Sequence, residues 1–346
     1  VAAAMLTRGT KTMTRSEIED RMTELKMAGS ITNFTTTRKN LPAALELVFD
    51  AMHNSIMPQD EFDQFKKQMQ VMIESMRDKP DALAQNAITQ HFNTYPKGDP
   101  RYEYSLDESL EQLNKLTVDQ VRAFYKEFGG TSRGEISIVG DFDPKAVEKI
   151  IRDDYAKYVS KAHYAPVVTE YRPVKATRVV IDTPDKENAI IVARSVFPIN
   201  DTAPDAPALT VANWILGGGT GLSNRLIERL RQKEGLSYGA GSRVRIPAKG
   251  DNGSFVFRAI VAPQNMLQAE ASARDVIAKA IKDGFTDQEV EEAKKGLLQA
   301  MQVARSQDDV VARSWNDKME NQRTWVFSKK QAEAISKLTT ADVNAA

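Results

Sequence analysis

Residues 222–238 read LSNRLIERLRQKEGLSY, a run in which apolar and charged residues recur with a helical period. Leu226 and Leu230 are four residues apart and therefore share one face of a helix. Gly235 follows the last charged residues and can take the left-handed conformation that ends a helix. Tyr238 then opens a segment with the composition of a strand. The pattern predicts a helix, a glycine turn and a strand in that order.

The polar side of this predicted helix carries several cations, among them Arg225, Arg229 and Arg231. An arginine near the helix end and Tyr238 beyond the glycine turn can both point into one cleft. Fixed guanidinium donors and one phenolic donor suit a carbonyl or carboxylate ligand. A basic helix face that is simply solvated explains the same residues, so both interpretations are open at this point.

Further helices and strands flank this segment. Capping boxes, in which a hydroxyl and a Glu or Gln three residues later bond the exposed amides of a helix start, begin at Thr14, Ser105, Thr117 and Thr286. Strand-like runs occupy 135–139, 178–183, 188–197, 237–246 and 254–261. This mixture predicts an α+β fold.

The two parts of the chain repeat each other. Glu61–Ala84 aligns with Glu289–Ala312 at one constant shift, and Lys115–Ala123 aligns with Lys337–Ala345 in the same order. Two ordered matches indicate duplicated units, although helices rich in Ala, Lys and Glu also resemble one another by composition alone.

The repeat predicts two tandem homologous domains over residues 1–165 and 176–346, each a mainly antiparallel sheet packed against helices. Prolines interrupt any regular pattern in 161–175, which is the predicted linker. The first copy lacks the strands that open the second, and its hairpin region is much shorter. We therefore expect a fragment of a larger protein, with residues either absent between Gly29 and Phe34 or joined there by a short hairpin.

Composition excludes several classes of site. The 346 residues contain 47 Lys+Arg and 47 Asp+Glu, so the net charge of zero argues against a protein built to hold nucleic acid through a basic face, while leaving a local basic patch open. The absence of cysteine excludes disulfides, Cys-ligated zinc and thiol nucleophiles. The three histidines, His53, His91 and His163, are far apart in the sequence, and none belongs to a zinc helix with two histidines on one face.

Two glycine-containing motifs match catalytic signatures only weakly. Residues 235–239 read GLSYG, but a predicted helix precedes Ser237 and a strand follows it, which reverses the order of a hydrolase nucleophile elbow. No histidine follows Ser237 to complete a triad. Residues 217–221 read GGGTG, yet they follow a helix and lack the Lys-Ser/Thr of a phosphate loop. Ordinary turns explain both segments better.

Residues 222–238 resemble the non-catalytic half of the pitrilysin/insulinase-type zinc peptidases, the inverted H-x-x-E-H family. The glycine-rich loop at 217–221, the duplicated α+β plan and the GDFDP turn at 140–144 resemble the same family. In that family four similar domains form two halves that close around a chamber, and the first domain holds the zinc motif. The resemblance implies that this chain is the non-catalytic half or an inactive partner subunit.

The resemblance also implies the substrate-binding residues. An Arg and a Tyr of the last domain reach across the chamber, bind the peptide and polarise the scissile carbonyl. Carried over by motif, these residues are Arg231 and Tyr238, with Tyr238 a candidate for stabilising the transition state in trans. An exposed strand edge is a further expected site for the peptide, through strand addition.

The zinc motif is degenerate in this chain. Residues 5–10 (MLTRGT) resemble the segment that follows H-x-x-E-H in active domains, which places its Glu and second His at Ala3 and Ala4. Alanine offers no metal ligand, so we expect no metal bound by this chain. Glu74 resembles the distal zinc carboxylate but lacks its partners. Zinc is expected in a catalytic half, on the same polypeptide or on a partner subunit.

The predicted function is the non-catalytic, substrate-binding half of a zinc-dependent metalloendopeptidase that degrades peptides in a closed chamber. The alternative is a catalytically inactive structural or binding subunit related to such peptidases. We expect no hydrolysis by this chain alone. The expected partners are the catalytic H-x-x-E-H half and a peptide substrate, with no nucleic acid and no membrane span. The resemblance favours a periplasmic or secreted location.

Overall fold

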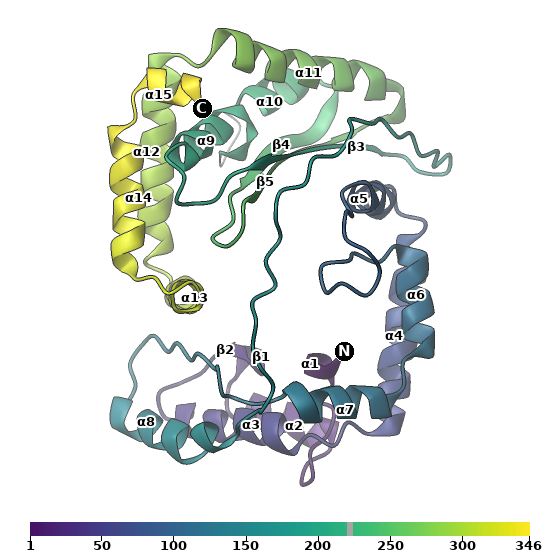
Figure 1. Cartoon of the computed structure of the whole chain (residues 1–346), viewed down its shortest axis with the longest axis vertical. Helices are drawn as coiled ribbons and strands as arrows, with labels where there is room; N and C mark the ends of the chain where they lie inside the picture. The colour runs from purple at the N-terminus through teal and green to yellow at the C-terminus, as the bar shows by residue number, and fades with distance from the viewer. Residues whose placement is uncertain (220–223) are drawn as a thin grey trace. The chain divides into compact units, whose positions relative to one another are not determined.

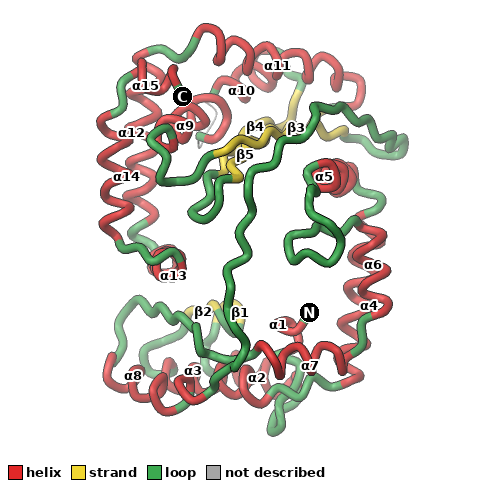
Figure 2. The backbone as a smooth tube through the Cα atoms, viewed as in Figure 1, coloured by secondary structure: helices red, strands yellow, loops and turns green. Residues whose placement is uncertain are grey.

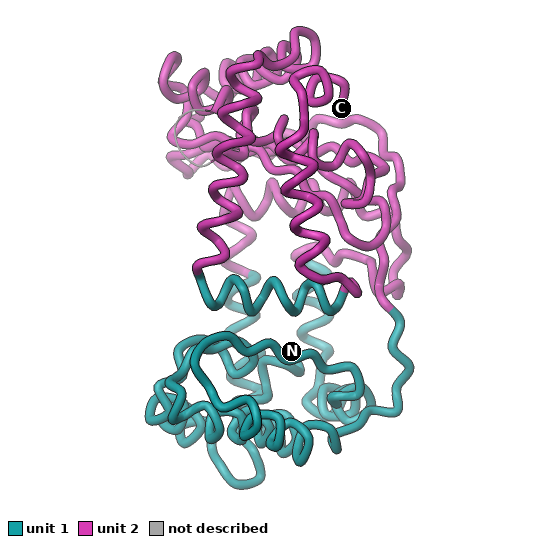
Figure 3. Tube along the Cα trace, turned by 90° about the vertical axis from the view of Figure 1, so that its left-hand side faces the viewer, with its two compact units in different colours: residues 1–73, 107–165, 307–320 teal, residues 74–106, 166–306, 321–346 magenta. Residues whose placement is uncertain are grey.

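The computed structural model describes residues 1–219 and 224–346 (Figure 1). Thr220, Gly221, Leu222 and Ser223, which belong to the glycine-rich loop and the start of the 222–238 motif, lie outside the described residues. The chain forms two compact units, coloured separately in Figure 3. Unit 1 comprises residues 1–73, 107–165 and 307–320, and unit 2 comprises residues 74–106, 166–306 and 321–346.

Unit 1 is mainly helical, with one small hairpin (Figure 2). Its helices are α1 (Ala2–Met5), α2 (Arg15–Glu24), α3 (Leu41–Asn54), α4 (Gln59–Met76, which crosses the unit boundary), α6 (Leu106–Lys115), α7 (Val118–Phe128), α8 (Pro144–Asp153), the short 3₁₀ turn η1 (Tyr155–Lys157) and α13 (Asp308–Glu320). The hairpin pairs β1 (Ala28–Ser30) with β2 (Asn33–Thr35) in antiparallel register, opposing Gly29 to Phe34.

The helices of unit 1 pack through their apolar faces. Met5 of α1, Phe62 of α4 and Val118 of α7 are at most 2% exposed and belong to one cluster. A second cluster joins α3 to Tyr155, whose buried hydroxyl donates to the carbonyl oxygen of Leu45 at 2.6 Å. Burial is therefore what holds this unit together, since each large apolar side chain contributes about 1.5–3 kcal/mol when removed from water.

Unit 2 contains a three-stranded sheet and the remaining helices (Figure 1). Its strands are β3 (Ala189–Pro198), β4 (Ser237–Arg245) and β5 (Asn252–Val261). Its helical segments are α5 (Pro80–His91), α9 (Ala206–Asn213), the π-helical η2 (Trp214–Gly218), α10 (Arg225–Ile227), the π-helical η3 (Glu228–Lys233), the 3₁₀ turn η4 (Pro263–Asn265), α11 (Met266–Asp283), α12 (Asp287–Ala304), α14 (Trp325–Lys337) and α15 (Thr340–Ala345).

The sheet of unit 2 is antiparallel with the strand order β3-β5-β4. One of its faces carries Phe257, Ala259 and Val261, which are at most 2% exposed and pack with Leu226 and Leu230. Because strand side chains alternate between faces, the residues between these three point to the opposite side. Helix α5 packs on that opposite side, where Asp81 pairs with Arg258 at 2.8 Å.

Three of the five predicted strands are confirmed, because the runs at 188–197, 237–246 and 254–261 correspond to β3, β4 and β5. The predictions of strands at 135–139 and 178–183 are wrong for this structure. A strand needs a neighbouring strand to complete its backbone hydrogen bonds, and neither run pairs with another strand in the described part of the chain. Together with the helices, the antiparallel sheets confirm the α+β class.

The predicted helix starts are largely confirmed. Thr14, Thr117 and Thr286 each cap a helix, and the side chain three residues later bonds back to the capping amide. Such reciprocal bonds satisfy two amides that have no partner within the helix. The fourth predicted start, Ser105, directly precedes α6.

Contacts at aligned positions support the internal repeat. Lys66 Nζ donates to the carbonyl oxygen of Leu116 at 3.0 Å, and Lys294 Nζ donates to that of Leu338 at 2.7 Å. The sequence alignment matches these two lysines with each other, and these two leucines with each other. A lysine that satisfies the end of a distant helix in both copies is a specific shared feature. The boundaries 1–165 and 176–346 remain a prediction.

The pair formed by Arg225 and Glu289 predicts a pH dependence of stability. The Arg225 Nε and Nη2 atoms each donate to Glu289 at 2.7 Å, and this hydrogen bonding lowers the pKa of Glu289 below its ordinary value of 4.5. A lowered carboxyl pKa adds stability above the unfolded pKa, and this stability is lost as the pH falls through the folded pKa. The Arg225→Gln substitution should therefore cost about 1–3 kcal/mol of unfolding free energy at pH 7.

Urea titrations at several pH values check this expectation. The difference between parent and variant should shrink as the pH falls below 4.5, where Glu289 begins to be protonated in the unfolded chain. Arg21→Gln is the matched control, because Arg21 forms an exposed pair with Glu24 and should change stability by less than about 0.5 kcal/mol. A difference that does not vary with pH would contradict the prediction.

No helix in the described part of the chain is both long enough and apolar enough to cross a membrane.

Candidate functional site

The helix before Tyr238 is capped at its start, packs its leucines into the core of unit 2 and changes from α-helical to π-helical winding along its length. Asn224 accepts a hydrogen bond from the amide of Ile227 at 2.9 Å and so caps α10. Leu226 and Leu230, predicted to share a face, are both fully buried in the core of unit 2. From Glu228 the helix continues as the π-helical η3. Single π-helical turns are frequent at functional sites.

Gly235 ends this helix as predicted. Its φ of 62° lies in the left-handed region, which glycine adopts without steric cost. The amide of Leu236 donates to the carbonyl oxygen of Leu230 at 2.8 Å, which closes the turn. The chain then enters β4 directly, so the helix and the strand are held at a fixed separation.

Most cations of this helix have acidic partners. Arg225 pairs with Glu289, Arg229 pairs with Glu234 and Asp275, and Lys233 pairs with Glu228 at 2.8 Å. These pairs support the interpretation of a structural, solvated basic helix for three of the four cations. They also remove those three side chains as free ligands for a substrate.

Arg231 differs from its neighbours. Its side chain is exposed on η3, and none of the residues in 1–219 and 224–346 forms an ion pair or hydrogen bond with it. An unpaired guanidinium keeps all five of its donors for a ligand. Of the cations in the helix that ends at Lys233, Arg231 is thus the one that remains available within the described structure.

Tyr238 occupies a β-bulge near the start of β4. Ser237 opposes Val261 and Gly239 opposes Ile260, so that Tyr238 is the extra residue on the bulged strand. Bulges re-aim side chains and are common beside active sites. The Tyr238 side chain is 68% exposed, and its hydroxyl forms no hydrogen bond with any described residue.

Arg231 and Tyr238 are both exposed, and the Gly235 turn lies between them in the chain. That the two side chains point into one cleft remains a prediction. The described residues give no direct hydrogen bond between the two side chains. Their roles in binding a substrate remain predictions.

Ser237 has a structural role. Its side chain is buried, with Oγ 2.8 Å from the carbonyl oxygens of Gly239 and Ile260, and Oγ accepts from the amide of Gly239 at 3.1 Å. The single hydroxyl proton is donated to one of the two carbonyl oxygens, while the oxygen accepts from the Gly239 amide, so the hydroxyl is used by the backbone at the bulge. A hydroxyl committed to the backbone is not an activated nucleophile, in agreement with the weak match to a hydrolase elbow.

The described residues contain no group of three or more His, Asp or Glu side chains placed to hold a metal ion. Ala3 and Ala4, at the degenerate motif, lie exposed on α1 and carry no ligating atoms. Glu74 is about half exposed and pairs with Arg77 at 3.3 Å. His53 stacks on Phe49 with ring centroids 5.3 Å apart. The described residues therefore do not fit a zinc site.

Sequence reasoning missed a group of arginines on the sheet of unit 2. Arg243 and Arg245 alternate along β4 and therefore share one face, and the register places Arg194 of β3 and Arg243 opposite the same residue, Val256. This face of the sheet is the one opposite the core. Tyr238 and Gly239, the two bulge residues, lie opposite Ile260, whose side chain is on this same face. The period-two spacing of arginines in the predicted 237–246 strand was the signal available in the sequence.

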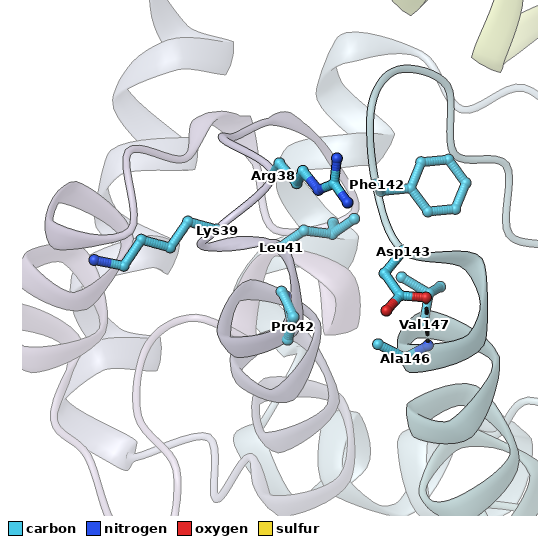
Figure 4. Close-up of a pocket in the computed structure, with 8 residues that line it drawn as sticks. All are labelled: Arg38, Lys39, Leu41, Pro42, Phe142, Asp143, Ala146 and Val147. Carbon is cyan, nitrogen blue, oxygen red and sulfur yellow. Dashed lines mark hydrogen bonds between the residues drawn. The ribbon is translucent and has the colours of Figure 1, made fainter.

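A pocket in unit 1 is a weaker candidate. It has a volume of about 450 Å³ and lies between the starts of α3 and α8, as Figure 4 shows. Two of its three charged lining residues have structural partners: Arg38 pairs with Asp141 at 2.7 Å, and Asp143 caps α8 by accepting from the Ala146 amide at 3.3 Å. The candidate site is therefore the Arg231–Tyr238 region of unit 2.

Comparison with known proteins relates the chain to zinc peptidases. An uncharacterized zinc protease of Mycobacterium tuberculosis is 24% identical over 299 residues, covering 83% of this chain and 66% of the relative. One of Streptomyces coelicolor is 24% identical over 277 residues, covering 78% and 58%. A non-peptidase homolog of Helicobacter pylori is 24% identical over 188 residues, covering 54% and 42%. The chain thus spans less than two thirds of the length of each relative.

Solved structures share the fold. The peptidase M16 inactive domain of Pseudomonas fluorescens superposes with a TM-score of 0.83 at 20% identity, covering 99% of this chain and 82% of that one. The periplasmic protease PqqL of Escherichia coli gives a TM-score of 0.67 at 15% identity, covering 99% of this chain and 38% of that one.

A family model provides the assignment. The model described as the peptidase M16 inactive domain matches residues 115–297, more than half of the chain. The matched range contains the helix, the glycine turn and the strand of residues 222–238. The resemblance to the pitrilysin/insulinase-type zinc peptidases is confirmed: this chain belongs to the peptidase M16 inactive domain family.

Proposed function

We propose that this chain is the non-catalytic, substrate-binding half of a zinc-dependent metalloendopeptidase that degrades peptides in a closed chamber. One observation carries the proposal. Arg231 is exposed and unpaired within the described structure, whereas the other cations of the same helix are neutralised by acidic partners. This contrast supports a ligand-binding role for Arg231, because its guanidinium donors are not used within the described structure.

The two residues have complementary chemistry. The guanidinium of Arg231 donates to a peptide carbonyl oxygen of the substrate and holds the chain in place. The hydroxyl of Tyr238 donates a hydrogen bond to the oxygen of the scissile carbonyl, where negative charge develops in the transition state. The catalytic H-x-x-E-H half, on the same polypeptide or on a partner subunit, supplies the zinc. This chain contributes binding and charge stabilisation.

The second candidate is a catalytically inactive structural or binding subunit. The similarity to the Helicobacter pylori relative described as a non-peptidase homolog favours it. The two candidates differ in what they require of Arg231 and Tyr238, because a subunit that only supports assembly does not need either side chain in contact with a substrate.

Replacing Arg231 by Gln tests the proposal. Combined with the catalytic half, the variant should raise KM for a peptide about tenfold and change kcat little, because Arg231 contacts the bound peptide before and during the reaction. Steady-state kinetics with a fluorogenic peptide give both constants. Arg274→Gln is the control, since Arg274 is an exposed arginine of α11 whose pair with Glu270 is expected to contribute little.

Equal KM values for the parent and both variants would favour the structural subunit. Thermal unfolding of each variant checks that the fold is intact. Substitutions of exposed side chains such as these are expected to change the unfolding free energy little.

A further inference from the structure

The outer face of the unit 2 sheet concentrates positive charge. Arg194, Arg243, Arg245 and Arg258 all lie on the face opposite the core, according to the strand register. The side chains of residues two apart on β4 are separated by about 7 Å, and positions two strands apart are separated by about 10 Å. In a chain with equal numbers of acidic and basic residues, this is a local excess of cations.

Within the described residues, one of the four arginines forms an ion pair with an acidic side chain. Arg258 pairs with Asp81 of α5, with Nη2 and Oδ1 2.8 Å apart. Arg243 and Arg245 are exposed, and no described residue forms an ion pair or hydrogen bond with either. Among the described residues, the acidic partner on this face therefore comes from α5, and the two arginines of β4 keep their positive charge unpaired.

Arg194 is held on this face at an energetic cost. Its guanidinium lies over the ring of Phe92, 4.8 Å from the ring centroid, and its Nε is buried without a hydrogen-bond partner. Burial lowers the pKa of Arg194 and the charge of Arg245 lowers it further, while Glu103 opposes this effect. An unsatisfied buried donor beside a like charge is a destabilising arrangement unless an anion joins it.

We propose that Arg194, Arg243 and Arg245 form a binding face for acidic side chains of an extended peptide, so that the preferred substrates of this protein carry Glu or Asp. The inference rests on the proposed function, because it gives the substrate class of the same site. The occupant is identified by charge complementarity: within the described residues none of these three cations forms an ion pair, and their face also carries Tyr238.

The geometry also gives a position for the acidic residues. Tyr238 lies five residues before Arg243 on β4, which corresponds to about 17 Å along an extended strand. A peptide that runs beside β4 covers the same distance in about five residues. Acidic side chains located about five and seven residues from the scissile bond would therefore reach Arg243 and Arg245, whose spacing matches alternate residues of the peptide.

Peptide binding tests this inference with the full chain. The probes are two fluorescent peptides of the same length that differ only in two Glu or two Gln at alternate positions. Anisotropy titrations at low salt should show about tenfold tighter binding of the Glu peptide, and the double substitution R243Q/R245Q should remove the preference. R274Q/R313Q, which changes two exposed helical arginines, should preserve it.

The outcomes separate the inference from the proposed function. If both peptides bound with equal affinity, and if R243Q/R245Q did not change that affinity, the preference for acidic peptides would be overturned. The proposed function as a peptide-binding half would still stand. If neither peptide bound, both proposals would be overturned. Inorganic polyphosphate of equal charge is a competitor in the same assay. If it displaced the Glu peptide as effectively as unlabelled Glu peptide does, the face would be a general polyanion site, and a peptide-specific face would be overturned.

Discussion

Replacing Tyr238 by Phe should slow peptide turnover by about 10²–10³-fold when this chain acts together with its catalytic half. The substitution removes one hydroxyl and keeps the ring. A hydrogen bond to a developing oxyanion is strongest in the transition state, so its loss lowers kcat and kcat/KM together. Because Tyr238 is 68% exposed and its hydroxyl bonds no described residue, the change should leave the folding free energy nearly unaltered.

Rapid-mixing and steady-state assays with a fluorogenic peptide measure this effect. Tyr104→Phe is the matched control, because Tyr104 is also an exposed tyrosine, 43% accessible, and lies in a different part of unit 2. An unchanged kcat for Tyr238→Phe would argue for the structural subunit. A loss of activity with both variants would indicate a general effect of removing hydroxyls and would contradict the specific role of Tyr238.

The local features of the site could be predicted from the sequence because they depend on short-range chemistry. The spacing of Leu226 and Leu230 places both on one side of a helix, and both are fully buried. Gly235 takes the left-handed φ that the end of a helix requires. β-Branched and aromatic residues identify β3 and β5, and the alternation of Arg243, Val244 and Arg245 marks the end of β4; the partners of all three strands are present in the chain.

Features that depend on distant partners could not be predicted in the same way. The run at 178–183 has strand composition, but Val179 and Val180 are each 61% exposed and no described strand pairs with them. Composition favours an extended chain, whereas a sheet also requires a neighbour. The availability of Arg231 has the same origin, since Glu289 and Asp275, which neutralise its neighbours, lie far along the chain.

The bulge at Tyr238 and the π-helical winding of η3 are also absent from any simple sequence pattern. Both insert extra backbone into a regular element and rotate the side chains that follow. A regular helix and a regular strand would point Arg231 and Tyr238 in other directions. The family resemblance predicts a substrate-binding role for the two residues, whereas the π-helix and the bulge in which they lie were found only in the structure.

Replacing Leu230 by Ala should lower the unfolding free energy of unit 2 by about 2–5 kcal/mol, the range for a fully buried leucine. Leu230 is completely buried among Leu226, Leu236 and Phe257, so its removal leaves a cavity under η3. Urea unfolding gives the magnitude, with Leu267→Ala as the control because Leu267 is 68% exposed and should change stability by less than about 0.5 kcal/mol.

Leu230 directly precedes Arg231, and its carbonyl oxygen accepts the bond from the Leu236 amide that closes the glycine turn. The variant should therefore also weaken peptide binding under conditions where it is still folded. A destabilisation below about 1 kcal/mol, with peptide affinity unchanged, would show that packing under the helix does not position Arg231.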